Sequence, residues 1–384
     1  MRVLHVVTLV SPDGAFGGPV RVAANQAGAL RARGHDVVVM AGERGYGDDR
    51  PTELGGAPLH LFRARQLVPG TGFSGLASPP MYSAVRRALA GTDVVHVHLA
   101  RDLITLPAAW LARRAGVPYV LQPHGMVVGS GSPLAGPLDG LLTKRVLGGA
   151  GAVLYLTPEE RTGLTSVAAG PIALHELANG VPAAADVVPI DPGGTKRPEV
   201  LFCARLQGRK RPVLFAQMAR ALLREGVDAS FVLVGPDEGE GAAVAAEVDA
   251  VGDPARLRWE GPLEPSETLA RMQQATIVAL PSVDEPYPMS VLEAMSVGRA
   301  VTVTDSCGLA PAVQKYDCGV VVDDSLDGFV AAVRGLLADP AGTAAMGLRA
   351  AETARRHFAM ESVAARLESI YTAVTAGHDP SITD

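Results

Sequence analysis

Two glutamates lie eight residues apart in the stretch DEPYPMSVLEAMSVGRAV (284–301). Glu285 follows an apolar run that predicts a buried strand, whereas Glu293 lies within an apolar stretch that predicts a helix. Two solvent-facing glutamates would predict a polar helix face, but the residues around Glu293 are almost wholly apolar, and a carboxylate there needs a partner. Because acidic residues in nucleotide-binding α/β folds accept hydrogen bonds from sugar hydroxyls, the spacing favours a ligand with a sugar at each end.

The start of the predicted helix supplies groups that bind an anion. Met289, Ser290 and Val291 follow Pro288, and the first N–H groups of a helix have no partner inside it. The helix dipole adds a partial positive charge at this end. We therefore expect a diphosphate to lie at these N–H groups, between the sugars that the two glutamates hold.

A second group of candidate residues is basic. The stretch CARLQGRKRP (203–212) places Arg205 at the end of a predicted strand and Lys210 shortly before a predicted helix. An arginine and a lysine in these positions would bind a diphosphate through charge-assisted hydrogen bonds. Arg209 and Arg211 leave an alternative open, since four basic residues within seven positions are also typical of a solvated loop.

A glycine pair follows the first predicted strand, in FGGPVRVAANQ (16–26). Gly17 and Gly18 would allow a ligand to approach the backbone closely at the start of a helix. The spacing is not the GxGxxG of a dinucleotide site, and a merely structural tight turn stays an alternative.

Continuous apolar runs alternate with helical patterns throughout the chain, and such runs predict strands of a parallel sheet that is buried on both faces. The runs of the first half are VLHVVTL (3–9), DVVVMAG (36–42), DVVHVHL (93–99), YVLQPHG (119–125) and AVLYLTP (152–158). Those of the second half are VLFCARL (200–206), SFVLVGP (230–236), RLRWEGP (256–262), TIVALPS (276–282), AVTVTD (300–305) and GVVVD (319–323). The pattern predicts an α/β protein with two Rossmann-like, doubly wound parallel-sheet domains, and a ligand normally lies in the cleft between such domains.

The length of 384 residues is too great for one ordinary core. The Pro/Gly-rich stretch PIDPGGTKRP (189–198) predicts a linker between an N-terminal domain, residues 1–188, and a C-terminal domain, residues 199–359. Residues 360–384 predict an amphipathic helix that packs back on the N-terminal domain, followed by a tail.

Two loops of the first half, residues 63–80 and 127–140, are long and rich in small residues. Loops of this kind in a compact α/β domain are either binding loops or surface insertions, and the sequence leaves both readings open.

The charge of the chain excludes one class of partner. The net charge of −6 is divided unevenly, because residues 1–188 carry 16 Lys/Arg against 13 Asp/Glu and residues 189–384 carry 18 against 27. Aromatic residues are only 4% of the chain, so the basic face and interleaved aromatics of a nucleic-acid-binding protein are missing. The mildly basic first half is compatible with a peripheral contact to an anionic membrane surface, although ordinary charge scatter explains it more simply.

The three cysteines lack paired spacing and predict neither a disulfide framework nor a zinc site. The N-terminal stretch MRVLHVVTLVSPDG has too short an apolar region for a signal peptide, and it predicts a first buried strand. No segment approaches the roughly 18 apolar residues of a membrane span. We therefore expect a cytoplasmic protein, with a peripheral contact at the inner membrane face as an open alternative.

The stretch PSVDEPYPMSVLEAMSVGRAVTVTD (281–305) closely resembles the signature of family 4 glycosyltransferases, which are retaining enzymes of the GT-B fold. The resemblance is to bacterial members of this family. The resemblance extends over essentially the whole chain. It includes FGGPVRVAANQAGALRARGHDVVV (16–39), DVVHVHLARDLITLPAAWLARRAGVPYVLQPHG (93–125), LANGVP (177–182), ARLQGRKRP (204–212) and HFAMESVAARLESIYTAV (357–374).

The resemblance implies a catalytic set of four residues, which are His124, Arg205, Lys210 and Glu285. In this set Arg205 and Lys210 would hold the donor diphosphate, and His124 would contact the donor sugar near its reacting carbon. Glu285 would bind the hydroxyls of the transferred sugar, and Glu293 those of the ribose.

The resemblance also implies roles for residues outside this set. Gly17 and Gly18 would lie by the diphosphate and the acceptor, and the helix start after Pro288 would offer N–H groups to the phosphates. Arg21 and His98 are expected on the acceptor side, although a histidine satisfied within the core is as good an interpretation of His98.

The implied activity is transfer with retention of a hexosyl group from a nucleotide-diphosphate sugar, a UDP-sugar before a GDP-sugar, to a hydroxyl of a glycan, lipid-linked or small-molecule acceptor. No DxD-like metal-binding cluster stands beside a phosphate loop, so we expect no metal and no cofactor other than the donor. The alternatives are a catalytically silent nucleotide-sugar-binding subunit, a sugar-nucleotide epimerase of the related fold, and a nicotinamide dehydrogenase, which the missing GxGxxG disfavours. Arg211 departs from the family, which usually has glycine there.

Overall fold

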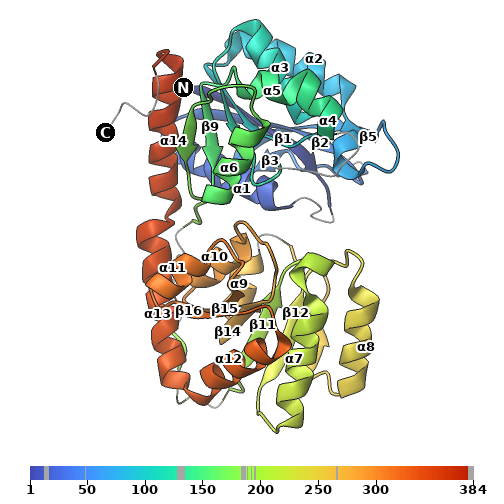
Figure 1. Ribbon diagram of the computed structural model, residues 1–384, viewed down its shortest axis with the longest axis vertical. Coiled ribbons are helices and arrows are strands. Elements are labelled where there is room, and N and C mark those ends of the chain that lie inside the picture. The colour runs from blue at the N-terminus through green and yellow to red at the C-terminus, as the bar shows by residue number, and fades with distance from the viewer. Residues whose placement is uncertain are drawn as a thin grey trace. The chain divides into compact units, whose positions relative to one another are not determined.

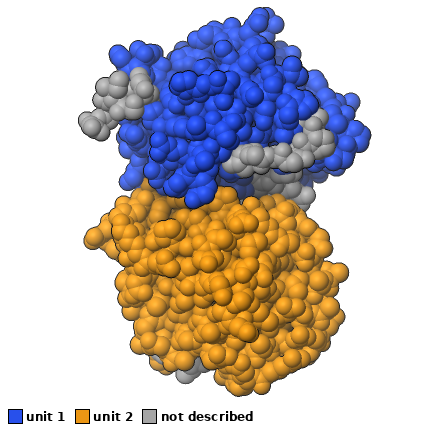
Figure 2. Space-filling model, viewed as in Figure 1, with its two compact units in different colours: residues 1–180, 360–384 blue, residues 181–359 orange. Residues whose placement is uncertain are grey.

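The computed structural model describes residues 1–12, 17–47, 49–127, 135–182, 187, 189–191, 193, 196–264 and 267–378. The chain forms two compact units, one made of residues 1–180 with 360–384 and the other of residues 181–359 (Figure 2). By this division the linker predicted at 189–198 lies in the second unit, and its residues 192, 194 and 195 lie outside the described part.

The first unit is built on an eight-stranded sheet with the strand order β10-β9-β8-β7-β1-β2-β4-β3. Its strands are β1 (Arg2–Val10), β2 (Asp36–Glu43), β3 (Glu53–Leu54), β4 (Ala57–Arg63), β7 (Val94–His98), β8 (Tyr119–Gln122), β9 (Ala152–Tyr155) and β10 (Leu174–Glu176). All neighbours are parallel except β3 and β4, which pair antiparallel. The carboxyl ends of the parallel strands therefore share one edge, where ligands of such sheets bind.

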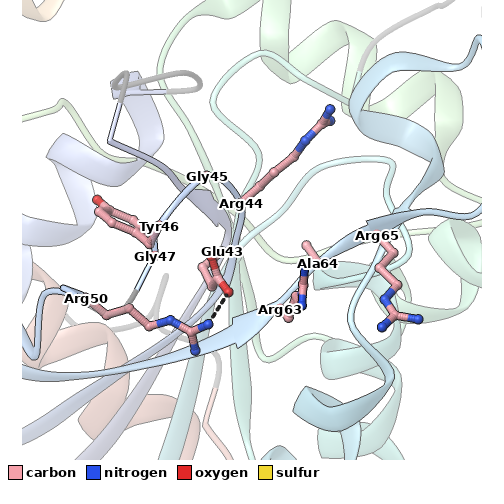
Figure 3. A pocket seen from close by; sticks show the side chains of 9 residues that line it. All are labelled: Glu43, Arg44, Gly45, Tyr46, Gly47, Arg50, Arg63, Ala64 and Arg65. Carbon is pink, nitrogen blue, oxygen red and sulfur yellow. Dashed lines mark ion pairs between the residues drawn. The ribbon is translucent and has the colours of Figure 1, made fainter.

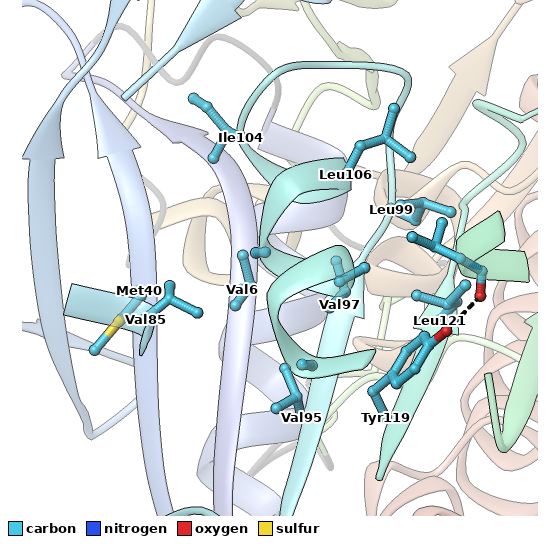
Figure 4. Close-up of a cluster of buried hydrophobic side chains, with 14 of the residues drawn as sticks. Val6, Met40, Val85, Val95, Val97, Leu99, Ile104, Leu106, Tyr119 and Leu121 are labelled. Carbon is cyan, nitrogen blue, oxygen red and sulfur yellow. Dashed lines mark hydrogen bonds between the residues drawn. The ribbon is translucent and has the colours of Figure 1, made fainter. Parts of the chain in front are cut away.

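Helices cover both faces of this sheet (Figure 1). They are α1 (Gly17–Ala32), α2 (Pro79–Ala88), α3 (Thr105–Ala115), α4 (Ala135–Leu138), α5 (Lys144–Leu147), α6 (Pro158–Val167) and α14 (Met360–Thr375), with the short turns η1 (Gly72–Gly75), η2 (Leu89–Gly91) and η3 (Asp139–Thr143). One apolar cluster joins a face of the sheet to α2, α3 and α5, and Figure 4 shows its side chains from neighbouring strands and α3 meeting. In it the Tyr119 hydroxyl donates to the Val146 carbonyl over 2.7 Å, which satisfies the buried phenol.

The opposite face packs against α1 and the C-terminal helix α14. Helix α14 buries Val363, Leu367 and Ile370 against strand residues that lie more than 200 positions earlier in the chain. Its Tyr371 is completely buried, and the hydroxyl is hydrogen-bonded to His96 Nδ1 at 2.6 Å. The last helix is therefore part of the core of the first unit.

The second unit contains a six-stranded parallel sheet with the order β13-β12-β11-β14-β15-β16. Its strands are β11 (Glu199–Cys203), β12 (Ser230–Val234), β13 (Leu257–Trp259), β14 (Ile277–Leu280), β15 (Ala300–Thr304) and β16 (Gly319–Val322). Its helices are α7 (Pro212–Arg224), α8 (Gly241–Val251), α9 (Thr268–Met272), α10 (Met289–Ser296), α11 (Ala310–Lys315), α12 (Leu326–Ala338) and α13 (Pro340–His357), with the turn η4 (Gly208–Lys210). Because β11 and β14 are neighbours in this sheet, the loops at their carboxyl ends lie side by side.

The predicted fold class, α/β with doubly wound parallel sheets, is confirmed, and each apolar run predicted as a strand contains one. Strand β4 was not among those runs, because it exposes alternate side chains such as His60. The predicted loop 63–80 contains a small antiparallel pair, β5 (Arg65–Gln66) and β6 (Leu76–Ala77). Of the predicted loop 127–140, residues 128–134 lie outside the described part. Among the described helices, none has the length and apolar character that crossing a membrane requires.

If α14 belongs to the core, Leu367→Ala should lower the free energy of unfolding by about 2–5 kcal/mol, because Leu367 is fully buried. The control is Arg366→Ala on the exposed face of the same helix, which should change it by no more than about 0.5 kcal/mol. Unfolding in denaturant measures the free energy for both variants. Equally small changes for Leu367→Ala and Arg366→Ala would show that α14 contributes nothing to the core.

Candidate active site

A buried ion pair lies at the carboxyl edge of the second sheet. Lys210 ends the turn η4 after β11, Glu285 lies in the loop after β14, and Lys210 Nζ donates to Glu285 Oε2 over 2.5 Å. Lys210 is 9% exposed and Glu285 7%. Arg209 Nη2 lies 3.5 Å from the same carboxylate oxygen. The sequence predicted both residues for one ligand site, and the fold brings them into contact.

Burial governs the charge of Lys210. Desolvation lowers the pKa of this lysine, the adjacent Glu285 carboxylate raises it, and the positive charges of Arg209 and Arg205 lower it again. The net direction is downward from the ordinary value of a lysine. The ammonium group is therefore a buried cation with one carboxylate holding it, and an anionic ligand would stabilise it further.

The loop that carries Glu285 is held by the loop after β15. Asp284 has a φ of +48°, and its N–H donates to Ser306 Oγ over 3.1 Å. The Gly308 N–H donates to the Glu285 carbonyl over 2.9 Å. The Pro286 carbonyl oxygen lies 1.8 Å from the position that a Cβ on Gly308 would occupy, so only glycine fits there. These contacts fix the direction of the Glu285 side chain.

Arg211 turns away from this pair. Its φ of +53° lies in the left-handed region, which explains why the family that the sequence resembles usually has glycine at this position. The guanidinium donates to the Asp324 carbonyl over 2.5 Å and lies 3.8 Å from the Asp324 carboxylate. Of the two interpretations of the basic run, Arg211 fits the solvated loop, because its guanidinium contacts Asp324 and not Glu285.

Arg205 has a carboxylate partner that the sequence did not single out. Its Nη1 donates to both carboxylate oxygens of Glu238, over 2.6 and 2.8 Å. Both side chains are about a quarter exposed, at 28% and 25%. No motif predicted Glu238, which follows β12, and only the neighbouring positions of β11 and β12 in the sheet bring the two together.

The start of α10 lies beyond Glu285 in the same loop. The described residues provide no hydrogen-bond acceptor for the backbone N–H of Met289 or Ser290, which leaves both groups available to a ligand. The Val291 N–H donates to the Pro288 carbonyl over 3.1 Å, and its contact with a phosphate stays a prediction. Glu293 is 6% exposed in the second turn of this helix.

In the first unit His124 is held in an unusual backbone conformation. It follows β8 with a φ of +53°, and Gly125 after it has a φ of +76°. The Gly125 N–H donates to Glu160 Oε1 over 2.6 Å, and Glu160 also accepts from the Leu156 N–H over 2.7 Å. Glu160 was missed by the sequence analysis, although TPEE, with Thr157 three residues before it, has the form of a helix capping box.

Behind His124 lies a row of histidine rings. His124 Nε2 is hydrogen-bonded to His98 Nδ1 at 2.8 Å, and His98 Nε2 to His5 Nδ1 at 3.1 Å. The rings of His98 and His96 are stacked with centroids 4.7 Å apart. Both nitrogens of His98 are engaged and the residue is fully buried, which favours the core interpretation, and a contact with the acceptor stays a prediction.

These histidines are neutral at neutral pH. Burial lowers the pKa of His5 to about 3, and burial also lowers the pKa of His96, His98 and His124. Ligand atoms of His5, His96 and His98 lie within 4.8 Å of one another, a spacing that a metal ion could use, but both nitrogens of His98 are already bonded to other histidines. A hydrogen-bonded row accounts for their positions without an ion.

The remaining predicted residues lie on α1. Gly17 begins the helix, and residues 13–16 before it lie outside the described part. A Cβ on Gly18 would meet nothing within 4 Å, which leaves open space at the helix start. Arg21 is half-buried one turn later.

Comparisons with known proteins identify two family domains in the chain. Residues 17–180 match the glycosyl transferase 4-like domain, and residues 191–356 match the glycosyl transferases group 1 domain. The D-inositol 3-phosphate glycosyltransferase of Corynebacterium diphtheriae is 28% identical, in a match over 73% of this chain and 70% of that protein. The glycogen synthase of Mycobacterium tuberculosis is 28% identical over 98% of this chain and 96% of that protein.

Among solved structures, that of HepE from Anabaena in complex with UDP and glucose has a TM-score of 0.74 to this chain. The identity is 16%, and the superposition covers 97% of this chain and all of the other. The fold of the two proteins is therefore the same.

The histidine row predicts how stability changes with pH. The unfolded chain binds protons on these histidines below about pH 6.5 and the folded chain does not, so the free energy of unfolding should fall as the pH falls below that value. His5→Gln removes one site that takes up a proton in the unfolded chain only. The free energy of unfolding should then fall less steeply with pH, by up to about 1.4 kcal/mol per pH unit. The control is His60→Gln, on an exposed position of β4. The free energy of unfolding is measured between pH 7 and 5 for the wild type, His5→Gln and His60→Gln. If it falls with the same slope in all three proteins, the account of a buried, neutral histidine row is contradicted.

Proposed function

Because this chain belongs to the glycosyl transferases group 1 family, with a glycosyl transferase 4-like domain before the group 1 domain, we propose a specific reaction for it. The enzyme is a hexosyltransferase, and the proposed reaction moves a hexosyl group, with retention, from a nucleotide-diphosphate sugar to a hydroxyl of an acceptor. The observation that supports it most is the contact between Lys210 and Glu285 beside the start of α10.

In the proposed reaction two cations of the second unit, Lys210 and Arg205, and the start of α10 hold the leaving diphosphate. Negative charge builds on the diphosphate as the glycosidic bond breaks, and preorganised donors stabilise such charge without reorganising. Lys210 is buried and already oriented by Glu285, and Arg205 lies close enough to influence its pKa. The N–H groups of Met289 and Ser290 add the positive end of α10. No metal or other cofactor is part of the proposed reaction.

The two glutamates are proposed to bind sugars. Lys210 and Arg209 both contact Oε2 of Glu285, and the other oxygen, Oε1, is proposed to accept hydrogen bonds from hydroxyls of the transferred sugar. Glu293, buried in α10 behind the diphosphate position, would accept hydrogen bonds from the ribose hydroxyls.

His124 is proposed to contact the donor sugar near the reacting carbon, with Gly17 and Gly18 giving the diphosphate and acceptor close access to α1. A neutral imidazole suits this task, because it donates or accepts a hydrogen bond without adding a charge. Its partner His98 fixes which nitrogen of the ring is available, and Glu160 fixes the loop beside it.

The proposed donor is a UDP-sugar, with a GDP-sugar next. The support is that HepE has been solved with UDP-glucose, at a TM-score of 0.74 and 17% identity to this chain. The acceptor is proposed to bind in the first unit, with Arg21 on its side of the site. Relatives named for an inositol phosphate and for glycogen show how widely acceptors differ within the family.

Lys210→Ala should reduce the slow release of nucleoside diphosphate from UDP-glucose in the absence of acceptor by on the order of 10²–10³, because one preorganised cation is lost. Release from GDP-glucose and ADP-glucose is measured alongside, and we expect UDP-glucose to be preferred by the wild type. In the wild type Arg209 Nη2 lies 3.5 Å from the same Glu285 oxygen, so one cation stays beside this carboxylate when Lys210 is removed.

The matched control is Lys315→Ala, an exposed lysine at the end of α11, which should keep the wild-type rate. Circular dichroism checks that both variants are folded. A folded Lys210→Ala protein with near-normal release would remove the role proposed for this lysine. A wild type that binds UDP-glucose but never releases UDP would indicate the silent binding subunit instead.

A further inference from the structure

A pocket of about 620 Å³ lies in the first unit, lined by Glu43, Arg44, Gly45, Tyr46, Gly47, Arg50, Arg63, Ala64 and Arg65. We call it the arginine pocket. Its residues come from the carboxyl end of β2, the loop that follows, and the carboxyl end of β4 (Figure 3). Nothing in the diphosphate site of the second unit uses these residues.

The charge of the arginine pocket is strongly one-sided. Its lining contains four arginines and one glutamate, in a chain whose net charge is −6. Glu43 is 2% exposed and pairs with Arg50 at 3.0 Å, as the dashed line in Figure 3 shows. Within the described part of the chain, no carboxylate lies within ion-pair distance of the other three arginines. Each of those exposed guanidinium groups has its donors available to a ligand.

The pocket is a built feature of the sheet edge. Arg63 and Arg65 flank the buried Ala64, and alternation along an extended chain turns both toward the solvent side. Gly45 has a φ of +96°, and a Cβ there would lie 3.3 Å from Pro12, which follows β1. The loop after β2 thus packs against the end of β1. Four arginines on one pocket lining make the local potential positive, which attracts an anion.

The strand order gives the distance from the arginine pocket to His124. His124 follows β8, and the order β8-β7-β1-β2-β4 places the pocket three to four strands away along the same edge. At about 4.8 Å between neighbouring strands, the separation is roughly 14–19 Å. Pocket and histidine can therefore contact two parts of one extended molecule, with the end of β1 and the start of α1 between them.

We propose that the arginine pocket binds a phosphate group carried by the acceptor, at a distance from the hydroxyl that receives the sugar. Arginine forks match phosphate oxygens in pairs, and exposed arginines on a rigid strand end recognise phosphate better than lysines would. The phosphate belongs either to a soluble phosphorylated glycan or to a lipid headgroup. This inference rests on the proposed function, because it assigns the acceptor of that reaction.

The test uses inorganic pyrophosphate as the probe, titrated calorimetrically into the full-length protein in the presence of saturating UDP, which occupies the donor site. The variant Arg63→Ser/Arg65→Ser should bind pyrophosphate at least tenfold more weakly than the wild type. The matched control, Arg86→Ser/Arg87→Ser, removes two exposed arginines of the same unit, on α2 and outside the pocket, and should bind as the wild type does. Equal binding by the wild type and the pocket variant, or no binding by the wild type, would overturn the proposal.

A second arm separates the two sources of the phosphate. The wild type is sedimented with vesicles of phosphatidylcholine alone and of phosphatidylcholine with phosphatidylglycerol. If the wild type sediments with the acidic vesicles and the pocket variant does not, the phosphate belongs to a lipid surface. Pyrophosphate binding without sedimentation would assign it to a soluble acceptor.

Donor hydrolysis by the wild type distinguishes failure of this inference from failure of the proposed function. If the wild type hydrolyses the donor but does not bind pyrophosphate, the proposed phosphate site in the arginine pocket is wrong and the transferase reaction stands. Pocket-dependent pyrophosphate binding by a protein that never hydrolyses a donor would overturn the transferase reaction and leave an anion-binding pocket.

Discussion

A lysine ammonium group that is 9% exposed depends on a compensating charge, and Glu285 supplies it to Lys210. Removing one partner of such a buried pair typically costs about 3–5 kcal/mol, because the other charge stays buried. A carboxylate alone is a modest partner for a cation that two arginines also repel. In the proposed reaction the donor diphosphate supplies the remaining negative charge beside the Lys210 ammonium group. The lysine is therefore stable beside Glu285 in the free protein and still attracts the donor.

Backbone strain gathers in loops at the carboxyl ends of strands in both sheets. Four described non-glycine residues have a clearly positive φ, and three of them, His124, Arg211 and Asp284, lie in loops after β8, β11 and β14. Such conformations cost about 1–3 kcal/mol each and persist only where the surroundings over-determine them. For His124 and Asp284 those surroundings are identified: Glu160 and His98 hold the first loop, and Ser306 holds the second.

Local patterns in the sequence were sufficient to predict the parallel sheets, because strands buried on both faces are continuous apolar runs. They also placed Lys210 and Glu285 at strand ends that prove to be neighbours. The partners of these residues were not predictable in the same way. Glu238 and Glu160 meet Arg205 and the Gly125 backbone across 33 and 35 positions, through loop geometry that no periodicity encodes.

The central claim is that Lys210 binds the diphosphate while Glu285 binds the transferred sugar. The most direct test is the affinity of Glu285→Gln for UDP and for UDP-glucose, measured side by side with the wild type by calorimetry. The account predicts that the variant keeps or gains affinity for UDP, because Lys210 loses its internal partner, and that it loses the additional affinity that glucose provides. Equal weakening for UDP and UDP-glucose would contradict this division of roles.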